Sequence, residues 1–221
     1  MTNYLRFFSF VFLLSILIVI LAYSTAPNNT FSTFKIEKSS RKLTSECKCR
    51  QKDEYFLKRA DLSKLQLTCD LFNSFRRGKG QKIIGYSLFG KKERYIRLLS
   101  NVSLQIMQYY PGWTMRVYHD SSIPNGKKCE LECLKDSHGK YVDNVDFCNI
   151  ESLPVKGELY QTWNAKNIVQ TIWRWFPIGD SFVNVFSSRD SDSIILQREV
   201  DASSQWLASN KPGHIMRGRY I

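Results

Sequence analysis

The order of apolar and polar positions predicts alternating strands and helices in the second half of the chain. The runs Lys82–Gly90 (KIIGYSLFG) and Trp113–Asp120 (WTMRVYHD) are typical of short strands. Between them, from Arg94 to Tyr110, apolar residues recur every three or four positions, which predicts an amphipathic helix with Asn101 on its polar face. A strand, a helix and a strand of these lengths form one right-handed unit with parallel strands.

The pattern continues beyond this unit. Lys127–Asn149 is interpreted as a cysteine-bearing insertion, and Glu158–Phe176 has the apolar period of a second helix. Ser181–Phe186 (SFVNVF) predicts a third strand, and Leu196–Ser209 predicts a third helix. The fold class expected from this alternation is α/β, with an open, mostly parallel, Rossmann-like sheet and flanking helices.

One long apolar segment precedes the folded region. Residues 7–23 carry no charge and approach the roughly 20 residues that a helix needs to cross a bilayer. The alternative is a cleaved signal peptide, whose apolar region usually spans about 7 to 15 residues. Both interpretations place the bulk of the chain in the secretory lumen. The length favours a membrane anchor, and the positive charges around it favour a cytosolic amino terminus.

The chain is therefore expected to comprise five parts. The segment after the anchor is rich in Ser, Thr, Asn and Lys and has no apolar period, which is typical of a flexible stem. The expected parts are a cytosolic tail (1–6), a transmembrane signal-anchor (7–23), a stem (24–46), a cysteine-containing lead-in (47–80) and the α/β domain (81–221).

Six cysteines agree with an oxidising compartment. Their even number favours disulfides, although six cysteines allow about 15 pairings. They are Cys47, Cys49, Cys69, Cys129, Cys133 and Cys148. A zinc site built from Cys129, Cys133, His138 and Cys148 is the alternative, but the spacing fits no common zinc pattern.

The net charge narrows the expected binding partners, and two sequons indicate candidate glycosylation sites. A net charge of +12 favours nucleic acid in a cytosolic protein, but a lumenal chain does not meet nucleic acid. Nucleotide diphosphates and acidic glycans are the anionic partners that remain, with a solvated basic surface as the alternative. Asn28 and Asn101 begin N-x-S/T sequons and are candidate glycosylation sites.

Two carboxylates, Asp190 and Asp192, directly follow the third expected strand. Ligands of open parallel sheets bind beyond the carboxyl ends of the strands, so this position favours a functional role. In an extended stretch both side chains project to the same side, where they can hold a hard cation such as Mn2+ or Mg2+. The alternative is helix capping, because Asp is a favoured N-cap and a helix is expected just afterwards.

The other strand ends and several arginines supply further candidates. Asp120 ends the second strand, where many nucleotide-binding sheets bind a ribose hydroxyl, but Asp also begins turns. Ser87 and Gly90 bound a segment that allows close approach of the backbone to a ligand. Guanidinium groups suit phosphates, and the candidates are Arg174, Arg189 and Arg198. Their alternative partners are Asp180, Asp190 and Glu199.

Several segments are similar to those of a known family. They are KIIGYSLFG, YYPGWTMRVYHD, WRWFPIGD (Trp173–Asp180) and, above all, FSSRDSDSIILQREVDASSQWL followed by HIMR. They resemble a group of largely uncharacterised animal and microbial glycosyltransferases of the GT-A fold, over roughly Gln81 to Arg217. The resemblance implies that Asp190 and Asp192 form the metal and nucleotide-sugar motif.

This sequence differs from those of similar proteins after the HIMR segment. In similar proteins the HIMR segment continues into an Asp-His-Pro stretch and a Gly/Trp-rich segment, whereas here it is followed by Arg217–Ile221. The expectation is a partial GT-A domain that lacks the half supplying the catalytic base. The expected function is that of a type II membrane glycosyltransferase of the Golgi or endoplasmic reticulum, acting on a glycan or glycoprotein acceptor. The alternatives are an inactive lumenal nucleotide- or glycan-binding protein and a basic domain that binds acidic glycans.

Overall fold

A computed structural model of the protein describes residues 40–50, 53–90 and 93–216. The expected tail, anchor and most of the expected stem lie outside these residues, and so does Asn28. Among the described residues no helix is both long and apolar enough to cross a bilayer.

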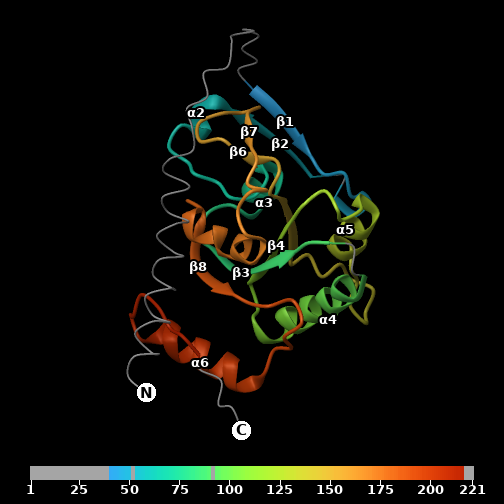
Figure 1. Ribbon diagram of the computed structural model, residues 1–221, viewed down its shortest axis with the longest axis vertical. Helices are drawn as coiled ribbons and strands as arrows, with labels where there is room; N and C mark the ends of the chain where they lie inside the picture. Colours follow the sequence, from blue (N-terminus) through green and yellow to red (C-terminus); the bar gives the residue numbers. More distant parts are fainter. Residues whose placement is uncertain (1–39, 51–52, 91–92, 217–221) are drawn as a thin grey trace.

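A four-stranded, all-parallel sheet forms the centre of the molecule (Figure 1). Its strands are β3 (Gln81–Leu88), β4 (Thr114–His119), β5 (Val145–Asn149) and β8 (Val183–Ser188), in the spatial order β5-β4-β3-β8. The chain therefore moves from β3 outward to β4 and β5, and then returns to the other side of β3 to form β8. This α/β arrangement is compatible with the Rossmann-like expectation.

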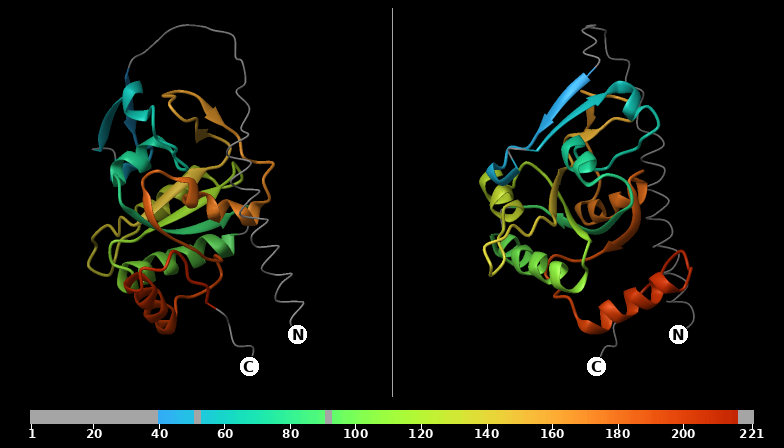
Figure 2. Two further views of the ribbon diagram at one scale, coloured as in Figure 1. Left: turned by 90° about the vertical axis from the view of Figure 1, so that its left-hand side faces the viewer. Right: turned by 180° about the vertical axis from the view of Figure 1, so that it is seen from behind.

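Helices cover both faces of the sheet (Figure 2). The main helix, α4 (Glu93–Tyr109), packs against one face with the residues that its period predicts, among them Leu99, Val102 and Ile106. Full burial of each such side chain contributes about 1.5–3 kcal/mol. The 3-10 helix η2 (Gln170–Gly179) packs against the other face through Trp173 and Phe176. Helix α6 (Gln197–Ala208) lies at the periphery, as the expected third helix.

The expected helix over Glu158–Phe176 is wrong. The structure contains a short hairpin of β6 (Leu153–Pro154) with β7 (Thr162–Trp163), then turns, then η2. The buried side chains of η2, Trp173 and Phe176, are three residues apart, which is the period of a 3-10 helix. An apolar spacing of three or four residues does not separate the two helix types, so the pattern alone was ambiguous.

The expected insertion Lys127–Asn149 is also wrong in part. It contains most of α5 (Asn125–Glu132) and the whole of β5, the outer strand of the sheet. The β5 sequence VDFCN shows only partial alternation because Asp146 is buried as well as Val145 and Phe147. Because a buried aspartate interrupts the apolar run, the sequence pattern does not indicate a strand here.

The lead-in is more ordered than the sequence indicated. Strand β1 (Ser40–Thr44) lies in residues expected to belong to the stem and pairs with β2 (Glu54–Lys58) in an antiparallel hairpin. The short helix η1 (Lys48–Arg50) lies between the two strands, and the helices α2 (Arg59–Leu62) and α3 (Leu71–Arg77) follow them. Apolar side chains from this region form a second core that includes Leu43, Leu57 and Phe72.

All six cysteines form disulfides, as the sequence predicted. The pairs are Cys47–Cys129, Cys49–Cys133 and Cys69–Cys148. The alternative zinc site is therefore excluded, because its three cysteines are oxidised, and the described residues contain no group of three or more metal-ligating side chains. Each bond connects the lead-in to the segment that carries α5 and β5.

Buried charges reinforce the same connection. Asp146 on β5 is fully buried and binds Arg76 at 2.6 Å and Arg77 at 2.9 Å from α3. Although burial alone raises the pKa of Asp146, Arg77 and Arg76 hold it below its usual value. On β4, buried Arg116 binds Asp180 at 2.8 Å. Removing one partner of such a pair leaves an uncompensated buried charge, which is strongly destabilising.

Candidate functional site

The point where the strand order reverses lies between β3 and β8. The chain adds strands on one side of β3 and then crosses to the other side, so the connections after β3 and β8 diverge at this position. In open α/β sheets ligands bind beyond the carboxyl ends of the strands at such a point. The residues that follow β3 and β8 are those singled out from the sequence.

Asp190 and Asp192 lie in a tight turn after β8. The backbone N–H of Ser193 donates to the carbonyl of Asp190 at 3.3 Å, so the two aspartates do not occupy an extended stretch, contrary to expectation. Both are exposed, and Asp190 keeps 65% of its side-chain area accessible. The capping alternative is also wrong, because the N-cap residue of α6 is Leu196.

Arg174 lies beside Asp190. Its guanidinium forms an ion pair with the Asp190 carboxylate, and its backbone N–H donates to the Ser87 hydroxyl at 3.0 Å. A side chain at Gly85 would meet the carbonyl oxygen of Arg174 at 2.2 Å, so glycine at this position of β3 allows η2 to lie directly on the strand. Three of the sequence candidates therefore converge next to β3.

Arg189 forms an ion pair with Glu199, one of the alternative partners that the sequence offered in place of a phosphate. Its side chain is 8% exposed and donates to the carbonyls of Ser193 at 3.2 Å and Ile194 at 2.9 Å. It therefore braces the turn that carries the aspartates. The Nε atoms of Arg174 and Arg189 are both buried and have no hydrogen-bond partner among the described residues.

Asp120 follows β4 and forms a side-chain turn. Its Oδ1 accepts hydrogen bonds from the backbone N–H of Ser122 at 3.0 Å and from the Ser122 hydroxyl. The Ser122 hydroxyl oxygen in turn accepts a hydrogen bond from the backbone N–H of Gly90 at 3.1 Å, so the loops after β3 and β4 are joined. Gly90 has φ +75°, a conformation that favours glycine. This is the turn interpretation of Asp120, and it places the carboxylate at the same edge as Ser87.

The described sequon lies on α4. Asn101 is exposed, as expected, whereas the Ser103 hydroxyl of the same sequon is buried and donates to Asn144 Oδ1 at 2.8 Å. A modifying enzyme needs this hydroxyl, so glycosylation at Asn101 would have to precede folding of α4.

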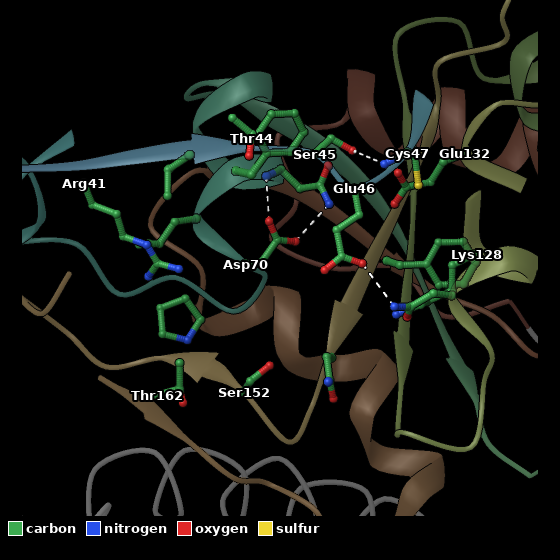
Figure 3. A pocket seen from close by; sticks show the side chains of 18 of the residues that line it. Arg41, Thr44, Ser45, Glu46, Cys47, Asp70, Lys128, Glu132, Ser152 and Thr162 are labelled. Atoms are coloured by element: carbon green, nitrogen blue, oxygen red, sulfur yellow. Dashed lines mark hydrogen bonds between the residues drawn. The ribbon is translucent and has the colours of Figure 1, made fainter. Parts of the chain in front are cut away.

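A cavity of about 480 Å³ lies at the other edge of the sheet, beside β5 (Figure 3). Strand β1, the loop after it, α3, α5 and the β6–β7 hairpin complete its wall. The Cys47–Cys129 disulfide belongs to the wall and ties the end of β1 to α5. The titratable groups Asp70, His119 and Glu132 line it, together with Arg41, Lys42, Glu46 and Lys128.

Burial shifts the pKa values of three of these groups. It lowers the pKa of His119 to about 4, so this ring is neutral at physiological pH. It raises the pKa of Glu132 to about 7, although Arg50 opposes the shift, and it also raises the pKa of Asp70. Perturbed groups that share a cleft are typical of functional sites.

Sequence reasoning missed this cavity. Asp70 and Glu132 lie in segments interpreted as an irregular lead-in and an insertion, and neither forms a recognisable motif. His119 stood at a strand exit, which was the one available signal. The wall of the cavity joins segments that lie far apart in the sequence, so no local pattern could have revealed it.

Comparison with known proteins finds no matching family model, no similar curated protein and no similar solved structure.

Proposed function

We propose that this protein is a glycosyltransferase of the GT-A class that uses a nucleotide-sugar donor and a divalent cation. The donor diphosphate would lie beyond β3 and β8, with Mn2+ or Mg2+ at Asp190 and Asp192. Glycans or glycoproteins in the lumen of the Golgi or endoplasmic reticulum would be the acceptors, and residues 7–23 would anchor the chain as a type II membrane protein.

The observation that carries this proposal is the position of the two aspartates at the reversal of strand order. They are exposed, they do not cap α6, and the turn that carries them is braced by Arg189. Exposed acidic side chains at such a place contribute little to the stability of the fold, whereas they can hold the divalent cation that a bound nucleotide diphosphate requires.

The residues present fit a hard divalent cation. Mg2+ is commonly held by one or two carboxylates together with substrate phosphates, so two aspartates suffice without a third protein ligand. When bound, the cation would neutralise the negative charge that develops on the departing diphosphate. The carboxylate of Asp190 can exchange its ion pair with Arg174 for the cation.

The remaining candidates would hold the donor. Arg174, once released from Asp190, could bind a phosphate, and its buried Nε has no acceptor among the described residues. Ser87 and Gly90 flank the same space, and Asp120 retains one carboxylate oxygen for a ribose hydroxyl. Arg189 would act as a positioning residue for the Asp190 turn. No residue is assigned as the catalytic base.

Calorimetric titration of the full chain with UDP or GDP, with and without MnCl2, tests the proposal. We expect metal-dependent binding that weakens at least about tenfold when Asp190→Ala and Asp192→Ala are combined. Asp201→Ala, which removes an exposed acid of α6, is the matched control and should bind normally. Equal binding by the double variant, or no metal dependence, would overturn the donor site.

A turnover assay separates the enzyme from its non-catalytic alternative. Release of free sugar from UDP-sugars, with Mn2+ present, should be measurable and absent from the Asp190→Ala, Asp192→Ala variant. Metal-dependent nucleotide binding without any sugar release would instead favour a lumenal binding protein.

A further inference from the structure

We propose that the cavity beside β5 is a binding site for a neutral saccharide unit. It lies at the edge of the sheet opposite Asp190, and the inference does not depend on the proposed donor site.

The cavity is preformed and of suitable size. Its volume of about 480 Å³ falls within the roughly 300–1,000 Å³ that is usual for small-molecule sites. The Cys47–Cys129 bond in the wall ties the loop after β1 to α5, and the neighbouring Cys49–Cys133 bond ties η1 to the end of the same helix. A wall fixed by covalent bonds loses little freedom on binding, which favours affinity.

Asp70 offers acceptors to the cavity. Its carboxylate caps α3, and each oxygen accepts one hydrogen bond of 2.9 Å from Asn73, one from the backbone and one from the side chain. Among the described residues Asp70 has no ion-pair partner, although burial raises its pKa. Its free lone pairs can accept from two adjacent hydroxyl groups of a sugar, because each carboxylate oxygen takes more than one hydrogen bond.

His119 offers a second acceptor. Its ring is 2% exposed, and Nδ1 donates to the carbonyl of Asp120 at 2.8 Å. Donation from Nδ1 in the neutral ring leaves Nε2 as an acceptor. Neutral hydrogen-bonding side chains surround these groups, and Phe72 and Phe147 provide apolar surface. Hydroxyl-rich molecules with an apolar ring face match this combination.

The charges in the wall favour a neutral ligand. Arg41 donates to the carbonyl of Leu159, and Lys42 binds Glu54 at 2.7 Å, so both cations are directed toward other partners. Among the acids of the wall, Glu46 accepts from Asn125 at 3.1 Å and Glu132 pairs with Arg50 at 3.7 Å. An ionic ligand gains little from charged groups that already have partners.

A metal ion and a peptide that extends the sheet are less compatible with the cavity than a saccharide. The described residues contain no group of three or more His, Cys, Asp or Glu side chains that could hold a metal ion, at the cavity or elsewhere. A peptide that extended the sheet would need free backbone groups along β5, but Arg50 donates to the carbonyl of Val145 at 3.4 Å and the Glu132 carboxylate accepts from the backbone of Phe147. The edge of β5 is therefore already occupied.

Saturation-transfer NMR on the full chain tests the proposal. The protein is kept in a detergent without a sugar headgroup, and the probes are lactose, maltose and N,N′-diacetylchitobiose, with a sulfated heparin disaccharide as the anionic comparison. We expect saturation of at least one neutral probe at millimolar concentration, unchanged when the salt concentration is raised. Absence of signal from all three neutral probes, or salt-sensitive binding of the anionic probe alone, would overturn the proposal.

Three variants locate the site. Thr162→Trp fills the rim and should abolish the signal. Asp70→Asn keeps a good helix cap but removes one acceptor, and should weaken binding about tenfold. Asp190→Ala should leave the signal unchanged, which separates failure of this proposal from failure of the donor site. Normal binding by Thr162→Trp would place the saccharide elsewhere and contradict the inference.

Discussion

The two edges of the central sheet differ in how they are held. At the β5 edge, three disulfides and the buried contacts of Asp146 tie the outer strand to the lead-in. At the β8 edge, the strand is only partly buried along most of its length, and the aspartates that follow it are exposed. We therefore expect the β5 edge to carry much of the stability, and the exposed Asp190 and Asp192 after β8 to carry little of it.

This contrast predicts that two aspartates differ greatly in their contribution to the free energy of unfolding. Asp146→Ala should lower the free energy of unfolding by about 3–5 kcal/mol, because it leaves Arg76 and Arg77 buried without their partner. Asp192→Ala, an exposed position, should change it by less than about 0.5 kcal/mol. Denaturant unfolding measures both, and similar losses would show that the two edges are equally important for stability.

The disulfide at the centre of the β5 edge should have the next largest effect. Replacing Cys69 and Cys148 together by alanine should destabilise the protein by about 2–4 kcal/mol, because the bond closes a loop across 79 residues. Thermal unfolding under non-reducing conditions measures the change. If Asp146→Ala and the double alanine variant are combined, a loss smaller than their sum would show that the bond and the charges stabilise the same contact.

The smallest predicted effect is a pH dependence. The folded-state pKa of Glu132, about 7, exceeds its unfolded value, so folded Glu132 binds more protons between about pH 4.5 and 7. Its contribution to stability is present below pH 4.5 and is lost as the pH rises through 7. Glu132→Gln should therefore gain up to about 3 kcal/mol relative to the unsubstituted protein across this window. His119, whose pKa is lowered, changes the stability in the opposite direction, but it does so in both proteins and cancels in the comparison. A difference in stability between the two proteins that stays constant with pH would contradict the Glu132 assignment.

The sequence predicted the regular parts of the fold well. The period of α4 and the apolar runs of β3 and β4 were sufficient, because burial of one face leaves a local signature. Strand β5 and the cavity escaped prediction because their buried acids, Asp146 and Glu132, depend on arginines from distant segments. Pairing between distant charges leaves no local pattern; the ion pair between Arg174 and Asp190 was among the alternatives that the sequence allowed, but the sequence did not decide between it and phosphate binding.

The arrangement of the disulfides has a consequence for biosynthesis. Cys47, Cys49 and Cys69 all pair with cysteines that lie 79 to 84 residues further along the chain. During synthesis the three early thiols therefore emerge well before any native partner. They must stay reduced, or be repaired by an isomerase, until α5 and β5 have followed. Among themselves the early cysteines form only non-native bonds, and for this reason the yield of correctly folded protein should depend on the oxidoreductases of the compartment in which it is made.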